Sequence, residues 1–90
     1  MTNKLEQDIC KELKDKLELS GIKAKIFSKP IVTLKLRRFY VISKHFKDID
    51  PSERQEIIWR IIKHKFTFEE FMLISIFYIL TPKEFKEYGL

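Results

Sequence analysis

The residues best able to do chemistry are few and widely spaced: His45, His64 and the single cysteine, Cys10. His45 precedes the main predicted helix and His64 lies near its end, so together they form only a weak candidate for a metal pair. A surface histidine, or for His64 a favourable place at a helix C-terminus, is the simpler interpretation. Cys10 lies on the apolar edge of the first predicted helix, as a buried structural thiol does. No arrangement for nucleophilic catalysis stands out, so the sequence predicts that the protein is not an enzyme.

Glycine-rich phosphate loops are excluded. The chain has two glycines, Gly21 and Gly89, whereas P-loop and dinucleotide motifs need several within a few residues. The Gly-x-x-Gly loop with which KH domains clamp RNA is absent for the same reason. Binding of nucleic acid would therefore depend on basic side chains.

A long stretch without acidic residues concentrates positive charge in the middle of the chain. Between Leu19 and Lys47 there is no Asp or Glu, and the whole chain has a net charge of +5. This pattern predicts one positive surface, although a solvated lysine-rich face without a ligand fits it equally well. The candidate phosphate- or partner-binding residues are Lys35, Arg37, Arg38, Lys44, Lys47 and Arg54.

Length and composition predict one folded domain spanning residues 1–90. The chain is 44% hydrophobic and 34% charged, which is typical of globular proteins. The longest near-continuous apolar run, residues 71–80, is shorter than the roughly 20 residues that span a membrane. The N-terminus has no signal-peptide pattern, and a lone cysteine excludes an internal disulfide. We therefore expect a cytoplasmic protein with no membrane partner.

The first half of the sequence predicts a helix and a hairpin. Leu5, Ile9, Leu13 and Leu17 form an apolar stripe, which Asn3 can cap and Gly21 can end. Alternating apolar residues then predict strands at 22–27 and 32–41, joined by a turn at 28–30 into an antiparallel hairpin. A slip in the alternation at residues 37–38 predicts a bulge or bend.

The second half predicts a helix, a strand and a short final helix. Asp50 and Pro51 open a helix whose apolar stripe is formed by isoleucines at 57, 58, 61 and 62, with Arg54 off the stripe. Residues 71–80 read as a strand, either central or covered on both faces. Its aromatics indicate core packing, or alternatively a partner surface. Thr81 then caps a last helix.

The predicted fold is thus α+β with the order αββααβα: a three-stranded mixed sheet packed against helices. The helical crossover before the last strand allows that strand to run parallel to its neighbour. This is the general layout of KH type II-like folds.

Residues 41–58, read as Val41-Ile42-Ser43-Lys44-His45-Phe46-Lys47-Asp48-Ile49-Asp50-Pro51-Ser52-Glu53-Arg54-Gln55-Glu56-Ile57-Ile58, resemble the centre of BolA-type proteins. The matching features are a strand ending in Ser43, then Phe46, Arg54 and an aliphatic pair. Downstream, residues 73–76 followed by Thr81-Pro82-Lys83-Glu84-Phe85 resemble the closing pattern of the same family. The resemblance covers nearly the whole chain and implies a BolA-like, KH type II-like fold.

The resemblance also implies partners and a cofactor, and here the sequence departs from the family pattern. BolA-like proteins that share an iron–sulphur cluster with a monothiol glutaredoxin have a histidine where this chain has Gln55. A second histidine or cysteine usually comes from the loop between the first two strands. Here that loop is predicted at Ser28-Lys29-Pro30, which has neither. Because an amide is a poor ligand for iron, we expect no cofactor bound by this chain alone and a doubtful shared cluster.

Three functions remain open. The first is a BolA-like adaptor that docks a monothiol glutaredoxin-type partner in iron handling, through the surface around Gln55, residues 28–30 and the basic hairpin. The second is a nucleic-acid-binding regulator in which basic residues neutralise phosphates and Phe39 and Tyr40 could stack on bases, although strand packing is the simpler role for at least one of the two. The third is a homodimeric scaffold built on the apolar last strand.

Overall fold

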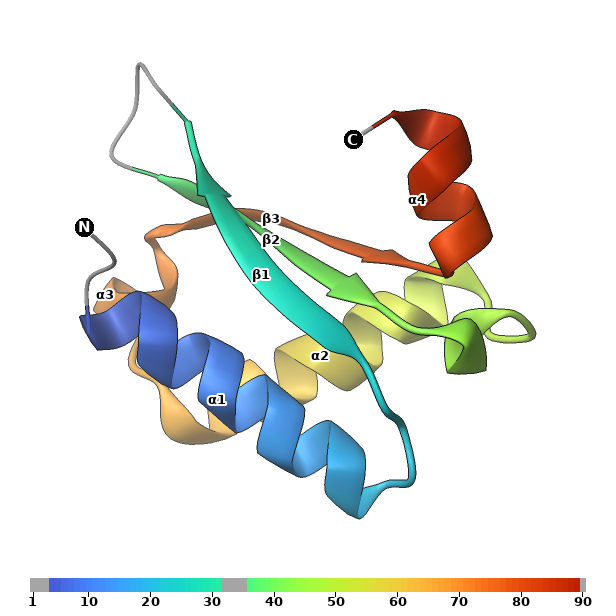
Figure 1. Ribbon diagram of the computed structural model, residues 1–90. Helices are drawn as coiled ribbons and strands as arrows, with labels where there is room; N and C mark the ends of the chain where they lie inside the picture. Colours follow the sequence, from blue (N-terminus) through green and yellow to red (C-terminus); the bar gives the residue numbers. More distant parts are fainter. Residues whose placement is uncertain (1–3, 32–35, 90) are drawn as a thin grey trace.

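The computed structural model describes residues 4–31 and 36–89 (Figure 1). The order of elements confirms the predicted αββααβα arrangement, with one short helix added before the last strand. The elements are α1 (Lys4–Leu19), β1 (Lys25–Pro30), β2 (Arg37–Ile42), the 3-10 helix η1 (Lys44–Phe46), α2 (Pro51–Lys65), α3 (Phe68–Phe71), β3 (Ile74–Leu80) and α4 (Pro82–Tyr88).

The three strands form one mixed sheet in the order β1-β2-β3. β1 and β2 are antiparallel, as the hairpin predicts, and β3 runs parallel to β2. β3 is therefore an edge strand, so the prediction of a central last strand is wrong. The other predicted alternative, a strand covered on both faces, explains the apolar residues of β3. Its C-terminal part has Ile79 in the main core on one face and Leu80 in a second cluster on the other.

Helices cover the two faces of the sheet unequally. α1 and α2 pack side by side on one face, while the short α4 crosses one end of the opposite face, which we call the outer face (Figure 1). The main core lies under α1 and α2 and includes Leu13, Phe39 and Ile58, each almost fully buried. On the outer face, Tyr40 stacks between Phe27 and Tyr78. This row follows the strand register, in which these three residues are cross-strand partners.

The boundaries of the hairpin differ from the prediction. Residues 28–30, predicted to turn, belong to β1 and pair with β2 as far as Pro30 opposite Arg37. Pro30 is tolerated because it ends a strand at the edge of the sheet, where a missing N–H costs little. Residues 32–35, which the prediction gives to the second strand, lie outside the described residues, as does the Asn3 cap.

The predicted irregularity at Arg37 and Arg38 is present as a shift in the β2–β3 register. Arg37 lies opposite Ile74 and Arg38 opposite Ile76. The extra residue is thus Ser75, on β3 rather than on β2. A bulge of this kind at a sheet edge re-aims the side chains beside it.

The last strand begins at Ile74, later than predicted, because Phe71 belongs to α3 and residues 72–73 form a turn. The Thr67 hydroxyl accepts a hydrogen bond from the N–H of Glu70, whose carboxylate accepts one from the N–H of Thr67. This reciprocal capping box stabilises a helical turn at 68–71. The caps predicted at Asp50 and Thr81 are confirmed, and Gly21 has the expected left-handed φ of 80°.

In the portion of the chain that the structure describes, no helix combines the length and the apolar character needed to cross a membrane.

Candidate partner-binding site

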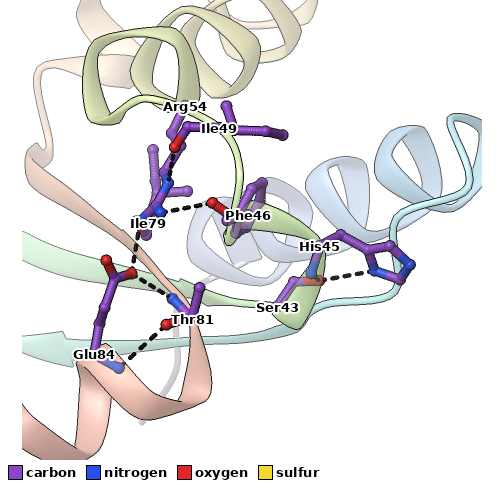
Figure 2. A network of polar contacts seen from close by, with 8 residues as sticks. All are labelled: Ser43, His45, Phe46, Ile49, Arg54, Ile79, Thr81 and Glu84. Carbon is purple, nitrogen blue, oxygen red and sulfur yellow. Dashed lines mark hydrogen bonds and ion pairs between the residues drawn. The ribbon is translucent and has the colours of Figure 1, made fainter.

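Arg54 is buried, with 4% of its surface exposed, although the sequence pattern places it off the apolar stripe. Its Nε donates to the carbonyl of Ile49 at 2.8 Å and its Nη2 to that of Phe46 at 2.6 Å. Its Nη1 donates to the carbonyl of Ile79 at 3.0 Å and to Glu84 Oε1 at 2.7 Å (Figure 2). The guanidinium is thereby committed inside the protein, so the interpretation of Arg54 as a phosphate contact does not hold.

Glu84 connects Arg54 to the start of α4. Its Oε1 also accepts from the N–H of Thr81 at 2.8 Å, and the Thr81 hydroxyl accepts from the N–H of Glu84 (Figure 2). The hydrogen bond from Arg54, with further help from the Thr81 N–H, lowers the pKa of Glu84 below its usual range. Through this pair, one guanidinium holds η1, the loop to α2, the end of β3 and the start of α4 together.

Gln55, next to Arg54 on α2, also binds the edge strand. Its Nε2 donates to the carbonyl of Phe77 at 2.9 Å. Phe77 and Ile79 are two residues apart, so their carbonyls point to the same side of β3. Gln55 and Arg54 therefore donate to two carbonyls on the side of β3 that faces away from β2. These hydrogen bonds protect part of the open sheet edge.

The arrangement around Gln55 does not fit a histidine-ligated iron–sulphur cluster. The amide nitrogen of Gln55 is held by the Phe77 carbonyl. Residues 28–30 lie in β1, at the sheet edge opposite to β3, so they do not meet Gln55 in one site as predicted. Within residues 4–31 and 36–89, no group of three or more His, Cys, Asp or Glu side chains could hold a metal ion.

The sequence interpretation missed a group of exposed apolar residues in and just before β3, of which Ile76 lies beside Gln55. Four of the exposed large hydrophobic side chains come from one short segment: Phe68 (67% exposed), Met72 (58%), Leu73 (36%) and Ile76 (40%). Gln55 and Ile76 line the same open groove of about 270 Å³, together with Tyr78 and Tyr88. We call Gln55, Met72, Leu73 and Ile76 the β3-edge surface.

The sequence predicts core packing for the aromatics at 71, 77 and 78, with a partner surface as the alternative. Core packing is confirmed, since Phe77 is buried in the core, Phe71 packs against Trp59 and Tyr78 packs against the second cluster. The signal that could have identified part of the β3-edge surface is Met72-Leu73, one residue after the acidic pair Glu69-Glu70, at the point where a helical turn ends.

The basic candidates do not form the single positive surface that was predicted. Arg37 points towards α1, where its Nε lies 2.8 Å from Glu6 Oε2 in an ion pair with a buried carboxylate. Arg38 is exposed on the outer face. Lys44 and Lys47 are exposed beyond the other end of β2, around η1. The six-residue strand β2 separates the two groups, and Lys35 lies outside the described residues.

The remaining chemistry-bearing residues are isolated from one another. His45 and His64 are both exposed, and His45 Nδ1 lies 3.2 Å from the Ser43 hydroxyl. Cys10 packs against the core, and burial, with a smaller contribution from Glu6, raises its pKa to about 11. These features agree with a structural role for Cys10.

No family model matches the sequence, and no curated protein matches it at a significant level. Among solved structures, the fold is similar to that of BolA1 from Arabidopsis thaliana, with a TM-score of 0.61 and 13% sequence identity. The match covers 91% of this chain and 96% of that chain. The protein therefore has a BolA-like fold, as the resemblance in residues 41–58 and 73–85 predicts.

Proposed function

We propose that this protein is a non-enzymatic adaptor that docks a monothiol glutaredoxin-type protein through the β3-edge surface. The observation that carries the proposal is the open groove that the exposed Ile76 shares with Gln55, with the exposed Met72 and Leu73 just before β3 in the chain. Exposed apolar side chains gathered on a small protein are a mark of protein–protein interaction. The work of such an adaptor lies in iron or iron–sulphur homeostasis, in a reducing, cytosol-like compartment.

Two structural features support docking without a shared histidine-ligated cluster. The resemblance implies a cluster ligand at the position of Gln55, and the Gln55 amide is occupied by a hydrogen bond to the carbonyl of Phe77. In addition, the adjacent Arg54 fixes the neighbouring carbonyl and the start of α4. The surface is therefore rigid before binding, which lowers the entropic cost of association.

Calorimetric titration with a purified monothiol glutaredoxin tests the proposal. The variant Ile76→Lys places a charge in the β3-edge surface, and we expect it to weaken binding by about tenfold or more, equivalent to about 1.4 kcal/mol or more. The matched control is Leu19→Lys, since Leu19 is 81% exposed at the far end of α1. It should leave the affinity unchanged.

Each alternative occupant of this surface has its own readout. Absence of binding by the unmodified protein contradicts the proposal. Light scattering distinguishes the homodimeric scaffold: a dimer that Ile76→Lys dissociates and Leu19→Lys does not would show that a second copy occupies the surface. A change in cluster absorbance on mixing would contradict docking without a shared cluster.

Nucleic-acid binding is the second candidate, favoured by cations on the outer face. Lys25 Nζ lies 5.8 Å from the ring centroid of Phe27, and Lys29 Nζ lies 5.3 Å from that of Tyr40. Arg38 is exposed on the same face. Phe39 and Tyr40 are each 1% exposed, so the prediction that they stack on bases is wrong, and contact would be made to phosphates.

Salt dependence tests this second candidate. Binding of an oligonucleotide should weaken steeply as salt rises, and Arg38→Ala should flatten that slope. Affinity that does not change with salt would count against it.

A further inference from the structure

Three lysines line one cavity at the junction of η1 and α4. The cavity has a volume of about 400 Å³ and is lined by Lys44, Lys47, Thr81, Pro82 and Lys83. All the charged residues in this lining are cationic. Like charges placed together repel each other, so their grouping around one hollow favours an anionic ligand.

The two segments that carry these lysines are held together from behind by Arg54. On the η1 side, Arg54 binds the carbonyls of Phe46 and Ile49, which bracket Lys47. On the α4 side, it binds Glu84, the residue after Lys83, and the carbonyl of Ile79 (Figure 2). The backbone segments that carry the lysines are therefore held in place before a ligand binds, which lowers the entropic cost of binding.

The two carboxylates of α4 near the cavity leave its lysines largely unopposed. Glu84, the nearest along α4, is engaged by Arg54 at 2.7 Å. Glu87 contacts Lys83 at 4.0 Å, but both side chains are mostly exposed, and such a pair is weak. The Thr81 hydroxyl accepts from the N–H of Glu84, a bond that does not use its own proton. The lining thus offers ammonium donors and a hydroxyl donor.

We propose that this cavity binds the phosphate group of a small phosphorylated molecule. A phosphate dianion presents several acceptor oxygens to surrounding donors, and lysine ammonium groups bind it as point charges. The volume exceeds that of a phosphate group, which leaves room for an organic portion against the ring of Pro82. The site is separate from the β3-edge surface, so it stands or falls independently of the proposed function.

Titration of the 15N-labelled full chain with inorganic phosphate, and separately with adenosine monophosphate, tests the proposal by NMR at constant ionic strength. We expect saturable shifts of the backbone signals of residues 44–47 and 81–83. Lys44→Gln and Lys83→Gln should each weaken binding by about tenfold. Lys86→Gln, on the same helix but outside the lining, should not change it.

Two outcomes would overturn the proposal. One is shifts that do not saturate, or that are equal in Lys83→Gln and Lys86→Gln, because they would report general ionic screening. The other is binding of oligonucleotides alone, with no saturable effect of either small probe, because it would assign the lysines to a nucleic-acid backbone. Thermal unfolding of each variant verifies that it remains folded.

Discussion

Arg54 and Glu84 are thirty positions apart in the sequence, and their side chains meet at 2.7 Å. This contact joins the start of α2 to the start of α4, and the same guanidinium binds the backbone of η1 and β3. The structure therefore depends on a single buried cation that brings four segments together.

Replacement of Arg54 should be severely destabilising. Arg54→Ala removes every hydrogen bond of the guanidinium and leaves buried carbonyls without a donor, at a cost of about 3–5 kcal/mol. Arg54→Lys keeps the charge but lacks the planar fork, so it should recover only part of that loss. Urea unfolding measures both, with Arg60→Ala as the control because Arg60 is exposed on the same helix. Equal stability of Arg54→Ala and Arg60→Ala would refute the role given to Arg54.

Stability should fall in acid through Glu84. Its pKa is lower in the folded protein than in the unfolded chain, because Arg54 donates to its charged form. Its contribution is therefore complete above the ordinary pKa of a glutamate, about 4.3, and is lost as the pH falls through the lower folded value. Glu84→Gln should flatten this part of the pH–stability curve. A curve of unchanged slope in the variant would contradict the assignment.

Arg37 and Arg38 should behave differently although they are adjacent. Arg37→Ala removes the 2.8 Å ion pair with the buried carboxylate of Glu6 and should cost about 2–3 kcal/mol. Arg38→Ala, at an exposed position, should change stability by about 0.5 kcal/mol or less. Adding Glu6→Gln to Arg37→Ala should restore part of the loss. Urea midpoints are measured for the unmodified protein, Arg37→Ala, Arg38→Ala and the double variant. A double variant as unstable as Arg37→Ala would show that loss of the ion pair does not cause the destabilisation.

Cys10 should be slow to react with thiol reagents. Burial raises its pKa to about 11, so near pH 8 its thiolate fraction is about 200-fold smaller than that of an exposed cysteine with a pKa of about 8.5. The rate of reaction with a disulfide reagent should therefore rise strongly on unfolding in urea. Equal rates in folded and unfolded protein would show that Cys10 is accessible and ionised.

Local signals in the sequence were sufficient for the element order. The caps at Asp50 and Thr81 and the left-handed Gly21 depend on neighbouring residues only, and each is confirmed. The alternation around the hairpin likewise predicts its antiparallel pairing. These features could be predicted because their physical causes act over a few residues.

Apart from the missed α3, which a local capping box forms, the errors depend on contacts between distant segments. Arg54 is buried because Phe46, Ile79 and Glu84 converge on it, and no local pattern shows that convergence. Residues 28–30 form a strand because β2 pairs with them. The predicted positive surface is divided because successive residues of β2 face opposite sides of the sheet, which sends Arg37 to Glu6 and Arg38 outward.

The most direct test of the central claim is an NMR map of the surface that a monothiol glutaredoxin contacts. Titration of the 15N-labelled protein should shift the signals of Gln55, Met72, Leu73 and Ile76 most strongly and leave those of Lys29 and Lys44 unchanged. Shifts centred on Lys25 and Lys29 of β1 or on the lysine cavity, with the β3-edge surface unaffected, would contradict the account.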